Sequence, residues 1–298
     1  MECYIGIDLG STTTKAVVMD EDYNVMGQGI TNSRSNYDIA AGVAKHEALI
    51  DTRFMLFRNA MKNVTALGDK YEAFMDELER NFRLEQYLEQ LIDLDETCTK
   101  ASENTRYSEW GSDLSDALSG VFKRVTTEAP ELFAPGAQRK SDFFRDIAGS
   151  QYSTISEEVA KQAETPFDVL LNIYDRSIIE VENRIYTETT NQNLMRALDR
   201  TLVNLPDLAP VASEVRTEVE KVLGIDLEET YVIGTGYGRA RLPFSKDHIR
   251  SEILCHGLGA HIMYNDTRTV LDIGGQDTKA IQVDKDGIVE SFQMNDRC

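Results

Sequence analysis

Residues 8–16 read Asp-Leu-Gly-Ser-Thr-Thr-Thr-Lys-Ala. A short apolar run, Cys3–Ile7, precedes this stretch and another, Ala16–Met19, follows it, so the pattern predicts a strand, a tight polar loop and a second strand. Gly10 lets the backbone approach a ligand closely, and successive loop amides form a concavity that binds anions. The stretch predicts a phosphate-binding hairpin, although Gly-Ser-Thr tips also serve turn chemistry alone.

A second stretch repeats the first near the other end of the chain. Residues 272–280 read Asp-Ile-Gly-Gly-Gln-Asp-Thr-Lys-Ala, at an offset of 264 positions (272 − 8). From Asp8 to Val25 and from Asp272 to Val289, eight of eighteen positions are identical. Self-similarity at a fixed offset indicates a repeated structural unit. We therefore expect a duplicated domain with two phosphate loops that face each other across a cleft.

Length and composition narrow the class of protein. A chain of 298 residues is long enough for two domains. With 51 acidic and 31 basic side chains its net charge is −20, which argues against a nucleic acid or an anionic membrane as a partner. The four cysteines lie far apart without a Cys-x-x-Cys pair, and no signal sequence or apolar run of transmembrane length is found. These features predict a cytoplasmic protein.

The periodicity changes along the chain. Residues 3 to about 34 alternate as a strand meander, and about 38 to 203 follow a helical rhythm. Four apolar stripes at steps of three and four predict helices. They are Ile50, Phe54, Phe57, Met61 and Val64, ending at Gly68; Tyr71, Phe74, Leu78 and Phe82, with Leu84, Leu88 and Leu91 beyond; Phe167, Leu171, Tyr174, Ile178, Val181 and Ile185; and Leu194, Leu198, Leu202 and Leu205.

The middle of the helical segment has a weaker pattern. Residues 97–165 are broken by Pro130 and Pro135, and we expect short helices and loops there around Trp110. Thr165 is a plausible cap for the third helix, before Pro166. The segment carries no Gly-rich loop and no metal-ligand spacing, so it is predicted to be an all-helical insertion. We expect it to act as a docking surface, because apolar stripes without an internal use need a partner.

An α/β pattern resumes after the helical segment. A helix on Val211–Val222 precedes Tyr231–Arg239, which runs from a strand into a Gly-rich turn, and Gly236 and Gly238 fit either ligand binding or a sharp bend. The stretch Ser251–Met263 reads as a helix with Gly257, Gly259 and Ala260 on a packing face. For the adjacent Cys255 and His256 core packing is favoured over metal ligation.

Five stretches together carry a resemblance to a known family. They are Asp8–Lys15, Gly234–Arg239, Ser251–Ala260, Asp272–Asp277 and Phe292–Cys298. They resemble the motifs of the BadF/BadG/BcrA/BcrD-type ATPases, which include the activators of 2-hydroxyacyl-CoA dehydratases and the ATPase subunits of class I benzoyl-CoA reductase. The family belongs to the superfamily of acetate and sugar kinases, heat-shock chaperones and actin. The resemblance covers about residues 3–35 and 206–298.

The resemblance implies an α/β fold of two duplicated ribonuclease H-like domains with ATP between them. We expect residues 1–37 and 206–268 to form the first domain, 38–205 the helical insertion, and 269–298 the start of the second domain. The chain stops at Cys298, inside the last motif, so it looks like the front part of a longer protein. As written it is expected neither to complete a cluster nor to hold adenine well.

The resemblance also assigns roles to residues. ATP or ADP with Mg²⁺ is expected between the two loops, and the nucleotide is expected to contact Gly10, Ser11, Thr12, Thr13, Lys15, Gly236, Gly238, Gly274, Gly275 and Asp277. Asp8 and Asp272 are expected to bind Mg²⁺ through water, the usual mode for this ion. The attacking water is oriented by Asp8, Asp272, Gln276 or Asp277. Lys15 and Lys279 fit a surface role as well as phosphate contact. Cys298 is expected to be the first cysteine ligand of a 4Fe–4S cluster shared between two subunits.

The large insertion resembles that of benzoyl-CoA reductase, and this favours an ATPase subunit that couples ATP hydrolysis to low-potential electron transfer. The implied partners are a homologous ATPase subunit across the cluster, the acyl-CoA-reducing subunits, and ferredoxin as electron donor. A dehydratase activator shares every motif and remains an alternative. A small-molecule kinase of the same superfamily, or an actin-like scaffold, would leave the Phe292–Cys298 string unexplained.

Overall fold

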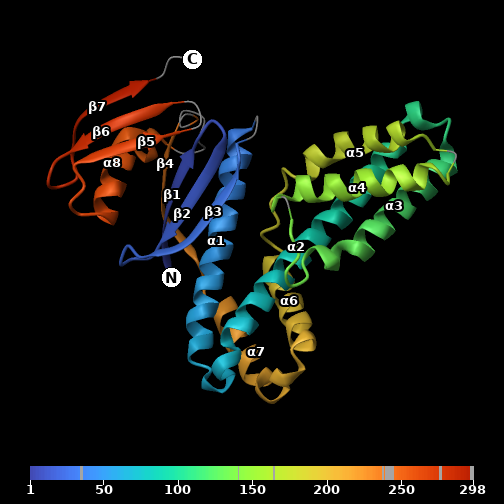
Figure 1. Cartoon of the computed structure of the whole chain (residues 1–298), viewed down its shortest axis with the longest axis horizontal. Helices are drawn as coiled ribbons and strands as arrows, with labels where there is room; N and C mark the ends of the chain where they lie inside the picture. Colours follow the sequence, from blue (N-terminus) through green and yellow to red (C-terminus); the bar gives the residue numbers. More distant parts are fainter. Residues whose placement is uncertain are drawn as a thin grey trace. The chain divides into compact units, whose positions relative to one another are not determined.

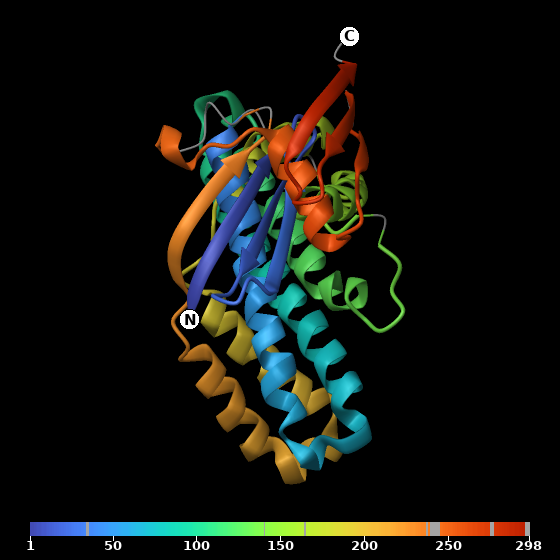
Figure 2. The same cartoon turned by 90° about the vertical axis from the view of Figure 1, so that its left-hand side faces the viewer.

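The computed structural model describes residues 1–298 except 34–35, 140, 164, 237, 239–244, 275–276 and 296–298. The chain forms two compact units: one comprises residues 1–56 and 222–298, and the other residues 57–221 (Figures 1 and 2). The first unit holds the strands and is α/β, whereas the second is helical. No helix in the described part of the chain is long and apolar enough to cross a membrane.

A four-stranded sheet forms the core of the α/β unit, in the order β3-β2-β1-β4. The strands are β1 (Glu2–Leu9), β2 (Thr13–Met19), β3 (Val25–Asn32) and β4 (Glu228–Thr235). β1 pairs antiparallel with β2 and parallel with β4, and β2 pairs antiparallel with β3. The predicted N-terminal strand meander is therefore confirmed, and the first loop lies at the tip of its first hairpin.

Helix α1 (Tyr37–Lys62) covers one face of this sheet. Alternate residues of β1 are buried there, and they pack against alanines spaced along the helix. The contacts are Cys3, Ile5, Ile7 and Leu9 with Ala41, Ala44 and Ala48. Gly27 and Gly29 of β3 allow the close approach, because a Cβ atom at these positions would lie 2.3 Å from the Ala48 carbonyl oxygen and 2.1 Å from that of Ala44.

A second sheet repeats the meander in the order β5-β6-β7. Its strands are β5 (Thr269–Ile273), β6 (Thr278–Val283) and β7 (Val289–Asn295). Asp272 pairs with Lys279 as Asp8 pairs with Lys15, and the register shifts after Gln282 as it does after Val18, 264 positions earlier (282 − 18). The sequence repeat thus has the same strand pairing in both copies.

The turns of the two meanders also match. Asp20 accepts hydrogen bonds from the backbone N–H groups of Asp22 and Asn24, at 3.0 and 2.8 Å. Asp284, its counterpart in the repeat, accepts them from Asp286 and Ile288 at 2.9 and 2.8 Å. The pKa of both aspartates lies below its ordinary value, mainly because of the side-chain hydrogen bond from Asn24 Nδ2 for Asp20 and of the backbone hydrogen bond from Ile288 for Asp284.

Helix α8 (Glu252–Met263) packs on the second sheet, on the face opposite to the one that α1 covers in the first copy. Gly257 lies against Val283 and Val289, and a Cβ atom there would approach Val289 Cγ2 to 2.7 Å. Leu271 and Ile273, the counterparts of the buried Ile7 and Leu9, are 64% and 73% exposed. The predicted packing role is thus confirmed for Gly257 and is wrong for Gly259, where a Cβ atom would meet nothing within 4 Å.

The helical unit is built around one long helix, α2, on which four further helices pack (Figure 1). The α-helices are α2 (Tyr71–Ser102), α3 (Gly111–Leu132), α4 (Phe144–Ala160), α5 (Phe167–Val181) and α6 (Thr190–Asn204), followed by α7 (Ala212–Leu223), which leads into the α/β unit. Short 3₁₀ helices are η1 (Thr65–Lys70), η2 (Thr105–Tyr107), η3 (Pro206–Val211) and, in the α/β unit, η5 (Lys246–His248).

Several details of the predicted insertion are wrong. The stretch 97–165 contains the long helices α3 and α4 in place of short helices and loops, because Pro130 falls in the last turn of α3 and does not break it. Thr165 does not cap α5: Pro166 occupies the N-cap position, and no side-chain cap hydrogen bond forms there. Since α5 ends at Val181, Ile185 lies beyond the helix.

The apolar stripes of the helical unit do not support the predicted docking role. The apolar stripes of α2, α3 and α5 are used internally, where they form one buried cluster with α4. Phe74, Leu78 and Phe82 are fully buried as well. Since these stripes already have packing partners within the chain, they do not require another protein to cover them.

Candidate nucleotide-phosphate site

The first loop is fixed by its own backbone and by Ser33. A Cβ atom on Gly10 would lie 2.6 Å from the Thr13 carbonyl oxygen, so the turn requires glycine. The Ser33 hydroxyl donates to the Gly10 carbonyl at 2.6 Å and lies 2.9 Å from the Thr14 hydroxyl, and the Ser33 N–H donates to the Thr12 carbonyl at 2.9 Å. These contacts leave Ser11 and Thr12 exposed at the tip of the hairpin.

Asp8, the residue before the end of β1, has one carboxylate oxygen that is hydrogen-bonded and one that has no partner in the described part of the chain. Oδ2 accepts from Lys15 Nζ at 3.3 Å, whereas the buried Oδ1 has no hydrogen-bond partner among the described residues. Gly236 gives this oxygen room: its φ is +95°, and a Cβ atom there would lie 2.6 Å from Oδ1. A buried carboxylate oxygen without a donor is costly in free energy. The geometry therefore favours a ligand at Asp8.

The Gly-rich turn packs against the end of β1. The Gly238 N–H donates to the Leu9 carbonyl at 3.0 Å, and a Cβ atom on Gly238 would lie 2.5 Å from Leu9 Cδ2. Both Gly236 and Gly238 thus bring the turn close to Asp8 and Leu9. The sequence left ligand binding and a sharp bend open as roles for Gly236 and Gly238, and the structure supplies direct evidence for the bend.

The second loop is closed by an ion-pair cluster. The Gly274 N–H donates to the Asp277 carbonyl at 2.9 Å. Lys279 is only 3% exposed, and its Nζ lies 2.9 Å from Glu252 Oε1, 3.1 Å from Asp277 Oδ1 and 3.2 Å from Asp272 Oδ2. Lys279 is therefore buried, which excludes the surface role that the sequence had left open for it.

Helix α8 reaches both aspartates of the repeat. His256 Nδ1 lies 2.9 Å from Asp272 Oδ2, and the ligand atoms of Asp8, Glu252 and His256 lie within 4.8 Å of one another. Core packing was predicted for His256 and is wrong, because the i, i+4 spacing places Glu252 and His256 on one face of the helix, toward the two loops. Cys255 is half-buried, and burial raises the pKa of its thiol.

The charges of the site determine what it can bind. Asp8, Glu252, Asp272 and Asp277 contribute four carboxylates, and Lys15 and Lys279 two ammonium groups. Burial raises the pKa of Asp272, but hydrogen bonds from Lys279 and His256 outweigh this effect and the pKa lies below its ordinary value. An excess of carboxylates repels a bare phosphate, whereas a divalent cation between carboxylate and phosphate relieves the repulsion. The unpartnered Oδ1 of Asp8 fits this requirement for Mg²⁺.

Three of the predicted site residues, Gly275, Gln276 and Cys298, lie outside the described residues. Gly10, Ser11, Thr12, Thr13 and Lys15 belong to the first hairpin, and Gly274 and Asp277 to the second. Sequence reasoning missed Ser33, Glu252 and the buried role of Lys279. The i, i+4 spacing of Glu252 and His256 on one helix was the available signal for Glu252. No local signal marked the burial of Lys279, because Lys15 holds the same position of the repeat and is exposed.

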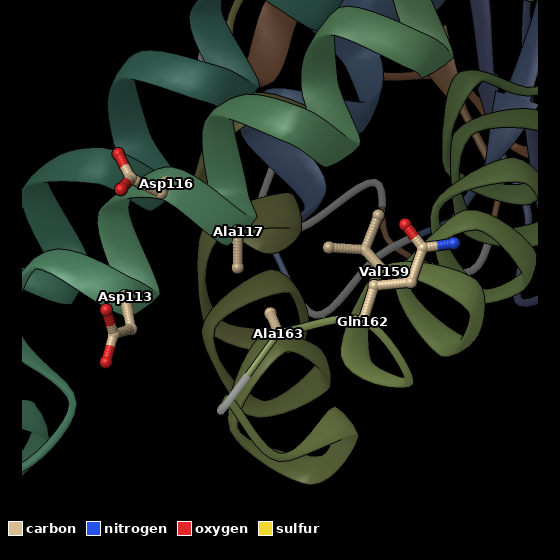
Figure 3. A pocket seen from close by; sticks show the side chains of 6 residues that line it. All are labelled: Asp113, Asp116, Ala117, Val159, Gln162 and Ala163. Atoms are coloured by element: carbon tan, nitrogen blue, oxygen red, sulfur yellow. The ribbon is translucent and has the colours of Figure 1, made fainter.

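A pocket of about 300 Å³ lies elsewhere, between α3 and α4 of the helical unit (Figure 3). Ala117, Val159 and Ala163 supply apolar lining, and the carboxylates of Asp113 and Asp116 lie at one edge. No basic side chain lines it among the described residues. This pocket is therefore poorly suited to a nucleotide, in contrast to the two loops.

Comparison with known proteins gives the family. The model of the BadF/BadG/BcrA/BcrD ATPase family matches residues 5–298. This chain belongs to that family. The BadF/BadG/BcrA/BcrD match includes both hairpin loops, α8 and the helical unit.

Curated relatives share shorter stretches with this member of the BadF/BadG/BcrA/BcrD family. It is 48% identical over 83 residues to protein YjiL of Escherichia coli, covering 28% of this chain and 32% of the relative. It is 43% identical over 79 residues to the activator of lactoyl-CoA dehydratase of Anaerotignum propionicum, covering 26% and 30%. It is 46% identical over 68 residues to the (R)-2-hydroxyglutaryl-CoA dehydratase activating ATPase of Acidaminococcus fermentans, covering 23% and 26%. The matches thus span about a third or less of each relative's length.

Proposed function

We propose that this chain forms the phosphate-binding part of a subunit that hydrolyses ATP and couples the hydrolysis to low-potential electron transfer. The observation that carries the proposal is the convergence of Asp8 and Asp272, from the two copies of the repeat, on Glu252 and His256 of α8. Membership of an ATPase family supports the same reaction.

The residues divide the work as follows. Backbone N–H groups and hydroxyls of the first loop, including Ser11, Thr12 and Thr13, bind phosphate oxygens, and Gly10 permits the approach. Asp8, with its unpartnered Oδ1, holds Mg²⁺ through water and orients the attacking water. When bound, Mg²⁺ neutralises the charge that develops on the transferred phosphoryl group. Asp277 and Gln276 are further candidates for orienting the water.

We extend the proposal to the architecture. The two meanders, with equal pairing and equal turns, support two ribonuclease H-like domains, the second beginning at 269. The helical insertion corresponds to the unit 57–221 and not to residues 38–205, because α1 packs on the first sheet and residues 1–56 belong to the α/β unit. A ligand bound between two such domains would favour their closure, and hydrolysis would favour their opening.

The electron-transfer role rests on Cys298 as a ligand of a 4Fe–4S cluster shared with a homologous subunit. Burial makes Cys3 and Cys98 poor ligands, since it raises the pKa of both thiols, to about 12 for Cys98. Ferredoxin would supply the electron, and acyl-CoA-reducing subunits would accept it. We favour benzoyl-CoA as the substrate of those subunits because of the large helical unit.

A second candidate is the activator ATPase of a 2-hydroxyacyl-CoA dehydratase. The names of two relatives, the activator of lactoyl-CoA dehydratase and the (R)-2-hydroxyglutaryl-CoA dehydratase activating ATPase, favour it. Both candidates use the same ATP chemistry and differ in the partner that receives the electron.

The test uses the full-length protein purified anaerobically with its neighbouring subunits. The rate of ATP turnover in Asp8→Asn is expected to be at least about a hundredfold lower than in the wild type, because the cation loses its anchoring carboxylate. ATP-dependent reduction of benzoyl-CoA supports the first candidate, and ATP-dependent dehydration of a 2-hydroxyacyl-CoA supports the second. Iron analysis of Cys298→Ala, with Cys98→Ala as control, tests the cluster. An unchanged turnover in Asp8→Asn would refute the loop assignment.

A further inference from the structure

The two lysines of the repeat have different environments although their sequence positions are equivalent. The Lys15 side chain is 47% exposed, and among the described residues it forms an ion pair with Asp8. The Lys279 side chain is 3% exposed and pairs with Glu252, Asp272 and Asp277. The difference arises because α8 covers the face of the second sheet on which Lys279 lies. The two hairpins therefore have the same strand pairing, but only the lysine of the second hairpin is covered by a helix.

The two aspartates differ in the same way. Asp272 Oδ2 accepts from Lys279 at 3.2 Å and lies 2.9 Å from His256 Nδ1, so two groups hold it in place. Asp8 is held through Oδ2 alone, at 3.3 Å from Lys15, and its Oδ1 has no partner among the described residues. A carboxylate that is fixed by two donors is less able to accept a further ligand than one with an unpartnered oxygen.

The contacts around Asp272 close a ring between helix and hairpin. Glu252 and His256 lie one turn apart on α8, and Asp272 and Lys279 are opposite residues of β5 and β6. Glu252 contacts Lys279, Lys279 contacts Asp272, and Asp272 contacts His256. Gly257 seats the helix directly on β6 and β7. Helix α8 and the second hairpin therefore form one rigid support.

We propose that Lys279 is a positioning residue: it fixes Asp272, Asp277 and the second phosphate loop to Glu252 of α8, while Asp8 alone offers a carboxylate oxygen to the Mg²⁺–ATP ligand. This inference rests on the proposed ATP chemistry and revises the symmetric role expected for Asp8 and Asp272. Lys279 acts through Asp272 and Asp277 and does not itself contact phosphate, because its three charged neighbours already surround Nζ.

The experiment is a double-mutant cycle in the full-length protein. Lys279→Met and Asp272→Asn are each expected to lower kcat by about tenfold to a hundredfold, because a displaced loop misaligns the reacting groups. KM for ATP is expected to change far less. The double variant is expected to match the single variants, since both changes release the same contact. Lys285→Met, at an exposed lysine paired with Asp286, is the matched control and is expected to leave kcat unchanged.

Two further measurements separate positioning from a general loss of structure. Lys279→Arg keeps the positive charge and is expected to restore part of kcat. Hydrogen exchange of the peptide 269–283 is expected to accelerate in Lys279→Met, and exchange in the helical unit to stay unchanged. If Lys279→Met does not fold, Glu252→Gln replaces it in the cycle. This change removes one charge of the cluster and keeps an acceptor oxygen. The same loss of kcat and the same non-additivity with Asp272→Asn are expected.

The outcomes distinguish this inference from the proposed function. Suppose that the wild type hydrolyses ATP. A normal kcat in Lys279→Met, or losses of kcat that multiply in the double variant, would then overturn the positioning role and leave the proposed function standing. A wild type that neither binds nor hydrolyses Mg²⁺–ATP overturns the proposed function, and the inference that rests on it.

Discussion

A Cβ atom on residue 236 would lie 2.6 Å from Oδ1 of Asp8, although the two residues are 228 positions apart (236 − 8). Gly236 also has a φ of +95°, a conformation that other residues adopt only with strain. The glycine therefore sets the position of the carboxylate oxygen to which we assign the cation.

Gly236→Ala is expected to displace either the turn or Asp8 and to weaken Mg²⁺–ATP binding by about tenfold or more, which is the effect of roughly 1.4 kcal/mol. Gly6→Ala is the control, because a Cβ atom on Gly6, two residues before Asp8 on β1, would meet nothing within 4 Å. Titration calorimetry with a non-hydrolysable ATP analogue measures the effect. Equal affinities in the two variants would show that Gly236 does not shape the site.

Two neighbouring glycines of α8 are expected to respond in opposite ways to alanine. Gly257→Ala places a methyl group 2.7 Å from Val289 Cγ2 and is expected to destabilise the α/β unit by about 1–3 kcal/mol. Gly259→Ala meets no atom within 4 Å and is expected to stabilise the helix by up to about 1 kcal/mol, because alanine has the better helix propensity. Thermal unfolding of the two variants compares them, and a Gly257→Ala protein as stable as the wild type would contradict the packing.

Glu77 is expected to make the stability of the helical unit depend on pH. Burial raises its pKa, but hydrogen bonds from Asn204 and Arg80 outweigh this effect, so the pKa lies below its ordinary value. A lowered carboxylate pKa contributes stability above the unfolded-state pKa, and this contribution is lost as pH falls through the folded-state pKa. Glu77→Gln is therefore expected to cost about 1–3 kcal/mol at pH 7 and progressively less in acid.

Trp110, the single tryptophan, lies in the same helical unit as Glu77, so its fluorescence measures the unfolding of that unit. Glu79→Gln is the matched control on the same helix, since the Glu79 side chain is 41% exposed, against 10% for Glu77, and pairs with Arg58. Its effect is expected to stay below about 1 kcal/mol. A constant difference between Glu77→Gln and wild type across the acid range would refute the assigned pKa direction.

The cysteines are expected to differ in reactivity. Cys98 is fully buried and burial raises the pKa of its thiol to about 12, so almost no thiolate is present at neutral pH. Cys255 is half-buried, and its pKa is raised as well. Iodoacetamide is expected to label Cys255 slowly and Cys98 only after denaturation, as measured by mass spectrometry of the labelled peptides. Labelling of native Cys98 at the rate of Cys255 would contradict the buried thiol.

Much of the α/β unit was predictable because its signals are local. The alternation in residues 3 to about 34 predicted the first meander, and the repeated Asp-x-Gly turn predicted a second copy of its hairpin. The pairing of Asp8 with Lys15 and of Asp272 with Lys279 comes from the structure. The helices α3 and α4 were missed because Pro130 and Pro135 were interpreted as breaking the whole stretch 97–165 into short helices and loops. Pro130 stands near the C-terminal end of α3, where it is tolerated, and the preceding stripe from Leu114 to Val125 determines the helix.

The candidate site was only half predictable for a different reason. The two loops are visible as a repeat, but the role of Lys279 depends on which face of the sheet α8 covers, and this is a tertiary choice. No local pattern distinguishes Lys279 from Lys15. His256 was assigned to packing because its partner Asp272 lies sixteen positions away and becomes a neighbour only when α8 sits on the second sheet.

The glycine pair of β3 has a consequence for folding fidelity. Two meanders with the same strand pairing offer α1 two sheets on which to dock, and a wrong choice would be a kinetic trap. Gly27 and Gly29 let α1 approach until its carbonyl oxygens fill the space of the missing side chains. At the equivalent positions of β7, 264 residues later, the chain carries Ser291 and Gln293. Side chains at these positions would occupy the space that the backbone of α1 fills on the first sheet, so we expect the two glycines to favour docking of α1 on its own sheet.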